Sequence, residues 1–400
     1  MLDSVLERRL RRKLLTVVDT LALDRDRRRG YVALARHHGL PVVAVAFDVP
    51  DAECRARNRA RPRPVPSKVL SGQLRRWAEV RDELAADGFD AVHPAAPVAV
   101  VHPELVHAPA AARRQQEEPM ALSFGLQIAT FEWPDGIGPG LASVARTAEE
   151  AGFTSVWVMD HFIQIPPVGP HWQNMLDSWT TLGFLAGHTD RARLGTMVTG
   201  ITYRNIAHLA KIAATLDVLS GGRAVCGVGA GWFEREHKAY GFDFPPLRRR
   251  YELLEDALQL LPLMWGPGAP AFEGATTKVG EALCYPRPAQ ERIPILVGGS
   301  GERRTLRLVA RYADACNLFG DAATVRHKVD VLHRHCAEVG RDPDQVEVTH
   351  LSSTLDASTE ELIGRYRDLA EAGVRTAVVR FPVLDEKAVE SFAPVMAAFS

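Results

Sequence analysis

The chain has 400 residues, of which 46% are hydrophobic and 24% charged, and its formal net charge is −1 with a pI near 6.9. This ordinary globular composition gives no global attraction to nucleic acid or to a membrane surface. No run approaches the roughly 20 apolar residues of a membrane span, and the N-terminus lacks the apolar core of a signal peptide. We therefore expect a cytoplasmic protein with one large and one smaller domain, without nucleic-acid or membrane partners.

The cysteine pattern excludes two classes of scaffold. The five cysteines are odd in number and form no C-x-x-C pair: Cys54, Cys226, Cys284, Cys316 and Cys336. This indicates reduced thiols rather than a disulfide framework or a zinc cage. The stretch "HRHC" (333–336) places its ligand-type residues at i, i+2 and i+3, which do not converge on one helix face. No metal site is predicted.

Residues 1–102 alternate short apolar strands with helical stretches. The strands are "LLTVVDT", "LPVVAVAFDVP" and "FDAVHP", and the Arg-rich "DRDRRRGYVALARHHG" is one of the helices between them. This order predicts an α/β segment with a parallel sheet.

The same segment resembles the C-terminal half of a P-loop kinase of the polynucleotide-kinase type. Asp19 ends a strand as a Walker B acid would, and alternating arginines resemble a phosphate lid: Arg55, Arg57, Arg59, Arg61 and Arg63. No G-x-x-x-x-G-K-[ST] loop occurs, so ATP turnover has no physical basis here. We interpret the segment as a truncated kinase fold with a structural or regulatory role, whose arginines are more typical of a solvated face. Its missing half would leave a sheet edge open to a partner.

Residues 103–120 combine Pro, Ala and charge without periodicity and are predicted to be a linker. From 121 to 400, eight apolar runs follow: "LSFGLQIA", "SVWVMD", "ARLGTMVTG", "RAVCGVGAG", "IPILVGG", "DACNLFG", "VEVTHLS" and "TAVVRFP". Segments with helical i, i+3, i+4 spacing separate most of them, and several end in a glycine at the expected position after the helix: Gly152, Gly221, Gly340 and Gly373. This alternation predicts a (β/α)₈ TIM barrel, which carries its chemistry at the C-terminal strand ends.

The second strand ends on Asp160 and His161. An imidazole at this position is expected to face the pocket and to act as an acid–base group, because its pKa lies near neutrality by type. Asp160 is expected to hold the loop or the imidazole. The third strand ends in "LGTMVTGITYRN", whose hydroxyls at Thr196, Thr199 and Thr202 meet the edge of a flat heterocycle in one interpretation and reflect β-propensity in the other.

Two later strand ends are rich in glycine. "GVGAGW" (227–232) resembles a dinucleotide fingerprint but lacks the third glycine in register, so we expect it to let a ligand approach the backbone. "LVGGSGERR" (296–304) opens a helix. Its backbone amides at Gly298, Gly299 and Ser300, with Arg303 or Arg304 nearby, predict a phosphate site.

Together, "EEAGFTSVWVMDHF", "LGTMVTGITYRN", "GVGAGWFE" and "IPILVGGSGERRTLRLVARYADACNL" resemble the bacterial luciferase-like superfamily over residues 121–400. The nearest subgroup looks like the deazaflavin-dependent oxidoreductases that use coenzyme F420. The resemblance implies hydride transfer between F420 and a small organic substrate, with the cofactor across the barrel mouth. An FMN-dependent luciferase-like monooxygenase is the alternative, and a nucleotide-dependent kinase-type fusion a weaker one.

The resemblance also assigns residues. It places His161 beside the deazaflavin ring with Asp160 before it, and Met197-Val198 at a dipeptide that often forms a non-prolyl cis bond under the ring. Further matching positions are those of Thr196 and Thr199, of Ala230, Gly231 and Trp232 as contacts to the cofactor, and of Gly298, Gly299 and Ser300 near its phosphate.

One departure bears on the substrate. Sugar-phosphate dehydrogenases of this family carry a catalytic glutamate where this chain has Trp232, and we expect Glu234 and Glu236 to lie on another helix face. The absence of this glutamate suggests a substrate that is bulkier and more apolar than a sugar phosphate, or a role as a reductase. The loops 134–140 and 163–176, the latter with Trp172, are predicted to roof the pocket. Family members are often dimers, so a homodimer is one expectation.

Overall fold

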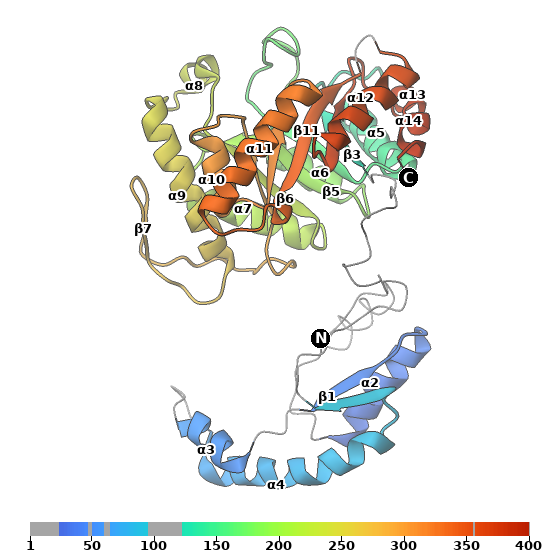
Figure 1. The fold of residues 1–400 in the computed structure, drawn as a ribbon, viewed down its shortest axis with the longest axis vertical. Helices are drawn as coiled ribbons and strands as arrows, with labels where there is room; N and C mark the ends of the chain where they lie inside the picture. The colour runs from blue at the N-terminus through green and yellow to red at the C-terminus, as the bar shows by residue number, and fades with distance from the viewer. Residues whose placement is uncertain (1–23, 47–49, 60–64, 95–121, 355–356, 400) are drawn as a thin grey trace. The chain divides into compact units, whose positions relative to one another are not determined.

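The structure is a computed structural model that describes residues 24–46, 50–59, 65–94, 122–354 and 357–399. The chain divides into two compact units, residues 1–114 and residues 115–400, coloured blue and green to red in Figure 1. Among the described residues, no helix combines the length and the apolar character needed to cross a bilayer.

The N-terminal unit is a small α/β segment. Its described elements are α2 (Arg25–His37), β1 (Val43–Ala46), α3 (Asp51–Arg59), α4 (Ser67–Glu83), a 3₁₀ turn (Leu84–Ala86) and β2 (Ala91–Pro94). The two strands pair in parallel, which confirms the expected sheet. The predicted strand with Asp19, the arginines Arg61 and Arg63, and the linker 103–120 lie outside the described residues.

A buried ion pair stabilises this unit. Arg28 is 1% exposed, and its guanidinium lies 2.6 Å from the carboxylate of Asp87 and 3.1 Å from that of Glu83. Arg25 contacts the same Asp87 carboxylate at 3.0 Å. Burial opposes ionisation of Asp87, but these guanidinium groups outweigh it and hold the pKa of its carboxyl below the ordinary value.

The described members of the alternating arginine series, Arg55, Arg57 and Arg59, lie on α3. Arg57 forms an ion pair with Glu53 one turn away, and Arg55 donates to the Ser71 hydroxyl at 3.0 Å. This arrangement matches a solvated helix face.

The second unit is a closed barrel of eight parallel strands, which confirms the predicted fold. Its strands follow the eight apolar runs: β3 (Ser123–Ile128), β4 (Ser155–Asp160), β5 (Arg193–Gly200), β6 (Ala224–Gly229), β9 (Ile295–Gly298), β10 (Ala315–Leu318), β11 (Glu347–Ser353) and β12 (Thr376–Arg380). Each strand pairs with its neighbours in chain order, and β12 closes on β3.

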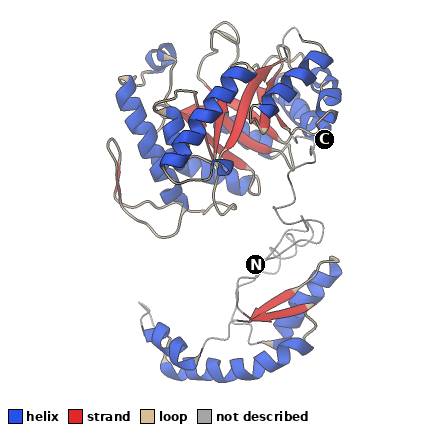
Figure 2. Ribbon diagram, viewed as in Figure 1, coloured by secondary structure: helices blue, strands red, loops and turns tan. Residues whose placement is uncertain are grey.

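Helices surround this barrel (Figure 2). The principal ones are α5 (Ile137–Ala151), α6 (Ser178–Ala186), α7 (Ile206–Leu219), α9 (Leu247–Trp265), α10 (Thr305–Tyr312), α11 (Ala322–Glu338) and α12 (Thr359–Glu371), with the shorter α8 (Glu234–Tyr240), α13 (Glu386–Ser391) and α14 (Ala393–Ala397). A two-stranded hairpin, β7 (Phe272–Glu273) and β8 (Lys278–Val279), projects after α9. The glycines predicted to end helices have positive φ, between 68° at Gly340 and 106° at Gly152.

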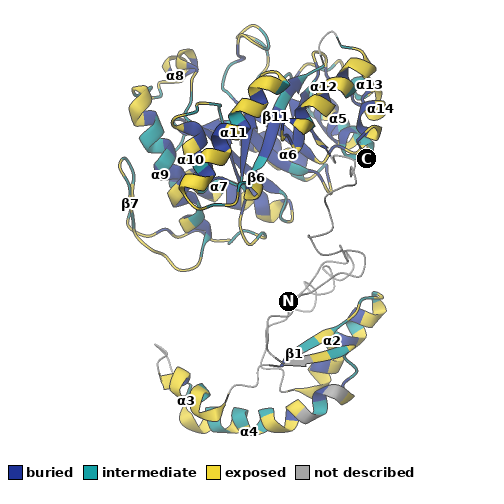
Figure 3. Ribbon diagram, viewed as in Figure 1, coloured by how far each residue is buried: buried dark blue, intermediate teal, exposed yellow. Residues whose placement is uncertain are grey.

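The strands are buried on both faces, as Figure 3 shows, because helices pack outside and side chains fill the inside. Trp157 of β4 occupies the barrel interior with Met197, Val225 and Leu296. Space for its ring comes from glycines: a Cβ on Gly195 would lie 2.5 Å from a ring carbon of Trp157.

The backbone of β5 bulges where the mouth begins. The Met197–Val198 peptide bond is cis, as the resemblance implies, and the pairing register shifts on both sides of β5 at this point. The Val198 side chain fills the space beside Gly229 and Gly298, where an added Cβ would lie 3.0 and 2.8 Å from its methyl groups. These glycines therefore admit a neighbouring side chain, rather than only a ligand as the sequence predicts.

The packing predicts opposite effects for two glycine substitutions. A Cβ on Gly227 would lie 1.9 Å from the carbonyl oxygen of Thr196, whereas one on the helical Gly364 meets nothing within 4 Å. Gly227→Ala should therefore lower the free energy of unfolding by about 3 kcal/mol. Gly364→Ala should raise it by about 0.5–1 kcal/mol. Denaturant unfolding of both variants checks this, and equal changes would contradict the packing described.

Candidate active site

The predicted residues of β4, β5, β6 and β9 meet at the C-terminal edge of the barrel. Asp160 ends β4 and His161 follows it, Val198 and Thr199 lie near the end of β5, and the turn after β6 carries Gly231. This is the edge at which TIM barrels place their chemistry.

Asp160 is a structural anchor of this edge. It is 1% exposed, and its carboxylate accepts hydrogen bonds from both terminal nitrogens of Arg204. The distance from Nη2 of Arg204 to Oδ1 of Asp160 is 3.0 Å. Arg204 also reaches Asp177, which caps the first turn of α6, at 3.1 Å. Arg204 thus links the end of β4 and the start of α6 to the loop after β5, and the loop-holding role expected of Asp160 stays a prediction. Arg204 was not singled out in the sequence, although it lies inside the "ITYRN" stretch.

His161 bonds a different carboxylate. Its Nδ1 lies 2.7 Å from Oε1 of Glu236, the third residue of α8. Glu236 is fully buried, and it also accepts the Tyr203 hydroxyl and the Phe162 backbone amide, the latter at 2.9 Å. The expectation that Glu236 lies on another face is therefore wrong. Helix α8 begins at Glu234, and its first turn contacts the end of β4 through Glu236.

Glu234, by contrast, is exposed and pairs with Lys238 at 2.9 Å. The two glutamates therefore differ in kind, and only Glu236 belongs to the site.

The charge state of Glu236 fixes the imidazole. Burial opposes its ionisation, but the bonds from His161, Tyr203 and Phe162 outweigh burial and hold the pKa of the carboxyl below its ordinary value. Burial and the same carboxylate raise the pKa of Tyr203, so its phenol stays protonated and donates. An ionised carboxylate only accepts, so Nδ1 of His161 carries a proton. Nε2 has no partner in the part of the chain that the structure describes, and is available to a ligand.

Aromatic side chains enclose this imidazole. Trp232 and Phe233 lie edge-on to it, with ring centroids 5.8 and 6.2 Å away. Trp232 is 56% exposed, and Trp172 of the predicted roofing loop is 76% exposed. The mouth therefore presents apolar rings to its ligand.

The threonines of β5 serve the protein interior. The Thr196 hydroxyl donates to the Gly227 carbonyl at 2.8 Å, and Trp179 of α6 donates to Thr199 at 3.0 Å. Both threonines are fully buried. Both hydroxyls therefore already have partners within the protein. Their predicted contact with the edge of a cofactor stays a prediction. The sequence could not show which face of a bulged strand they occupy.

Arg250 of α9 stabilises the turn after β6 through a hydrogen bond. Gly231 has φ +76°, and its carbonyl accepts Nη1 of Arg250, whose guanidinium also lies 4.1 Å over the Phe244 ring. Thr202 lies at the same turn and bonds Nε2 of the buried His237 at 2.7 Å. Gly231 is thus fixed in place at the mouth, and the cofactor contacts that the resemblance implies for Ala230 and Gly231 stay a prediction.

The turn after β9 offers a cradle for a ligand. Gly299 has φ +108°, and a Cβ there would meet no atom nearer than 3.7 Å, in contrast to Gly298. Asn317 of β10 is in register with Gly298. Ala315, two residues earlier on the same strand, faces the barrel interior, so Asn317 faces it as well. The buried Nδ2 of Asn317 has no partner among the described residues. A free amide donor beside an open glycine turn fits a flat ligand with polar edges.

No group of three or more metal-type ligands occurs within the described ranges. In the "HRHC" stretch, His335 bonds the Glu302 carbonyl at 2.8 Å and Cys336 is buried.

The fold and this site define a luciferase-like oxidoreductase. Residues 132–391 match the family model described as luciferase-like monooxygenase, which is more than half of the chain. The protein therefore belongs to the luciferase-like monooxygenase family. Residues 1–84 match a model described as an AAA domain, which confirms the resemblance of the N-terminal segment to a P-loop domain.

Several sequence relatives share part of the chain. An uncharacterized protein of Mycobacterium tuberculosis is 32% identical over 234 residues, 55% of this chain and 80% of the relative. An F420-dependent glucose-6-phosphate dehydrogenase of Kineococcus radiotolerans is 39% identical over 165 residues, 41% of this chain and 48% of the relative. One from Microbacterium testaceum is 36% identical over 195 residues, 48% of this chain and 55% of the relative. The chain thus spans about half the length of these dehydrogenases.

Solved structures share the barrel. An F420-dependent secondary alcohol dehydrogenase in complex with an F420–acetone adduct matches 70% of this chain and 99% of its own, with a TM-score of 0.62 at 20% identity. The F420-dependent tetrahydromethanopterin reductase of Methanopyrus kandleri matches the same shares with a TM-score of 0.57 at 20% identity. At these identities the likeness establishes the fold.

The Glu236 cluster predicts a pH-dependent contribution to stability. Because the pKa of Glu236 is lowered in the folded state, its stabilisation is full above the unfolded value near 4.3 and is lost as pH falls through the folded value. Glu236→Gln should be less stable than the wild type at pH 7, and the difference should shrink between pH 5 and pH 3. Urea unfolding across this range checks it; a difference independent of pH would contradict the ionised carboxylate.

Proposed function

We propose that the barrel catalyses hydride transfer between the deazaflavin coenzyme F420 and a small, largely apolar organic substrate. The observation that carries the proposal is the imidazole of His161, which the buried Glu236 holds through Nδ1 and whose Nε2 has no partner among the described residues. An imidazole so oriented suits proton management beside a hydride transfer. The dehydrogenases named as F420-dependent, at 39% and 36% identity over about half their length, support the choice of cofactor.

The residues at the mouth fit a flat cofactor. The Val198 bulge, the Ala230–Gly231 turn and the open turn at Gly299 and Ser300 would hold it, and the Asn317 amide offers a donor to its edge. When bound, F420 supplies the carbon that gives or takes the hydride. The protein's own contribution is to orient cofactor and substrate, to exclude water with the rings of Trp232 and Phe233, and to hold or release a proton at His161 Nε2.

The substrate class follows from the rim. Trp232 replaces the glutamate expected of a sugar-phosphate dehydrogenase, and its exposed ring stacks on Phe233 with centroids 5.1 Å apart. With Trp172 it makes an apolar rim, which favours a hydrophobic or aromatic substrate over a sugar phosphate.

Removing the imidazole tests the site. His161→Ala should keep the melting temperature within a few degrees of the wild type. It should lower turnover about 100-fold or weaken F420 binding, since positioned acid–base groups contribute about that much. His208→Ala is the matched control, because His208 is exposed on α7 and its side chain forms no hydrogen bond or ion pair with the residues that the structure describes. Equal behaviour of the two variants would remove His161 from the site.

Cofactor choice is tested directly by binding. Fluorescence titration of the purified full-length protein should show micromolar binding of F420 and at least tenfold weaker binding of FMN. Bleaching of the deazaflavin absorption on addition of a substrate would give the hydride direction. Tight FMN binding without F420 binding would overturn the proposal and favour an FMN-dependent monooxygenase, the class named by the family model.

A further inference from the structure

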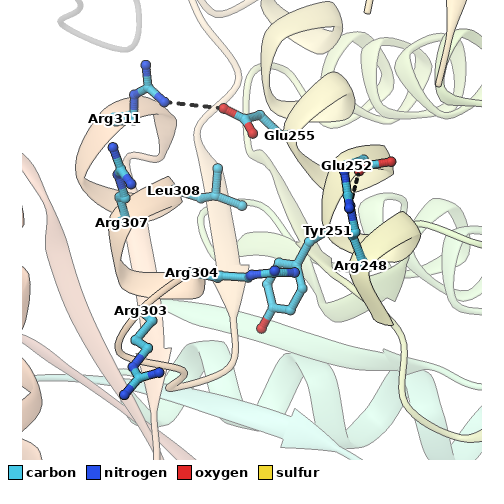
Figure 4. A pocket seen from close by; sticks show the side chains of 9 residues that line it. All are labelled: Arg248, Tyr251, Glu252, Glu255, Arg303, Arg304, Arg307, Leu308 and Arg311. Carbon is cyan, nitrogen blue, oxygen red and sulfur yellow. Dashed lines mark hydrogen bonds and ion pairs between the residues drawn. The ribbon is translucent and has the colours of Figure 1, made fainter. Parts of the chain in front are cut away.

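A cavity lies at the N-terminal end of the barrel, opposite the mouth, and its volume is about 430 Å³. Small-molecule sites span roughly 300–1,000 Å³, so this volume can hold a ligand. We call it the floor cavity. A smaller pocket between α9 and α10 (Figure 4) adjoins the turn after β9 through the bond of Tyr251 to Thr305, and so belongs with the site already described.

The floor cavity is enclosed by all eight strands of the barrel. Each strand contributes its first or second residue: Ser123, Ser155, Arg193, Val225, Leu296, Ala315, Glu347 and Thr376. Side chains alternate along a strand. Arg193 therefore faces inward with Gly195, which borders the Trp157 ring, and Glu347 faces inward with Thr349, which also lines the cavity.

The ring of Trp157 separates the floor cavity from the mouth. It packs in the barrel interior with Met197, Val225 and Leu296, and its Nε1 donates to the Ser155 hydroxyl at 2.9 Å. A ligand in the floor cavity therefore meets an apolar ceiling, on the far side of which lie the residues of the mouth.

Opposite charges stand on opposite walls of the floor cavity. Arg193 begins β5 and Glu347 begins β11, four strands away in either direction around the closed barrel. Asp314 lies beside Glu347, whose backbone amide donates to the Asp314 carbonyl at 2.9 Å. One wall is therefore acidic, and the wall that faces it is basic.

These charged groups keep hydrogen-bonding capacity for a ligand. The Arg193 side chain forms no hydrogen bond or ion pair with the described residues, and Glu347 accepts from the Thr376 hydroxyl at 2.5 Å through Oε1 alone. Asp314 uses Oδ2 for both the Ile295 amide, at 2.8 Å, and Arg292, at 3.3 Å.

The unpaired groups argue against a purely structural role for this end of the barrel. In TIM barrels the N-terminal end serves stability. A partly buried charge without a partner costs stability, and a structural floor is expected to hold paired or apolar side chains. Arg193 breaks this expectation without internal compensation, which is typical of a binding site.

We propose that the floor cavity binds a small zwitterion, an α-amino acid with an apolar side chain. Its carboxylate pairs with the Arg193 guanidinium, a geometry that allows two parallel hydrogen bonds. Its ammonium group bonds Glu347 and the remaining oxygen of Asp314. The apolar side chain lies under the Trp157 ceiling.

The choice of a zwitterion follows from the two walls. An anion without a cationic group would meet the acidic wall unpaired, and a cation without an anionic group would leave Arg193 unpaired. A ligand with both charges satisfies both walls. This site is independent of the proposed function, because it shares no lining residue with the mouth.

Calorimetric titration of the full-length protein without cofactor tests the proposal with L-valine, L-leucine and L-phenylalanine. At least one should bind with a millimolar or lower Kd. Its amide, which lacks the carboxylate, and its N-acetyl derivative, which lacks the ammonium group, should each bind about tenfold more weakly, as expected for loss of one hydrogen-bonded charge. Absent binding of all three amino acids, or equal binding of an amino acid and its two derivatives, would overturn the proposal.

Variants assign each charge to its wall. Arg193→Gln should weaken the amino acid about tenfold but leave the amide unchanged, because the amide has no carboxylate to lose. Glu347→Gln should weaken the amino acid and leave the N-acetyl derivative unchanged. The matched control is Arg367→Gln, which removes an exposed arginine of α12 and should stay within about twofold of the wild type.

Equal losses in Arg193→Gln and Arg367→Gln would contradict the site. Melting temperatures within a few degrees of the wild type show that each variant keeps its fold. F420 affinity should be the same in Arg193→Gln and in the wild type. If F420 does not bind at all, the proposed function fails while the amino-acid titrations decide the floor cavity by themselves.

Discussion

The buried carboxylate of Glu236 is the interaction on which the mouth of the barrel depends. It joins three separate segments: His161 and Phe162 after β4, Tyr203 after β5, and its own helix after β6. A buried carboxylate is costly unless it is fully hydrogen-bonded, and three donors satisfy this one. Because the donors come from different strand ends, the same bonds that keep Glu236 ionised also set where the imidazole of His161 points.

Two further constraints complete the edge. The Asp160–Arg204 pair fixes the loop after β5 against α6, and the Val198 bulge occupies the space that Gly229 and Gly298 leave open. The mouth is therefore held by side-chain contacts on the side of β4 to β9. Exposed rings such as Trp172 and Trp232 lie around it, where loops rather than the scaffold set specificity.

Much of the fold was predictable, because eight apolar runs with helical stretches between them leave few architectures other than a barrel. The site was predictable only in part. His161 follows from its place at a strand end. Helical spacing counted from Trp232 places Glu236 on another face, whereas α8 begins at Glu234 and brings Glu236 to the imidazole. Thr196 shows the other limit: a bulge changes which side of the strand a residue faces, and period-two alternation cannot anticipate it.

The most direct test of this account is the tautomer of His161, read from the imidazole ¹⁵N resonances of the full-length protein near pH 8. Assignment comes from the His161→Ala spectrum. An ionised Glu236 requires the proton on Nδ1, and in the neutral imidazole this leaves Nε2 without a proton. The account predicts the Nδ1–H tautomer in the wild type and its loss from dominance in Glu236→Leu. A wild-type imidazole protonated on Nε2 alone would contradict it.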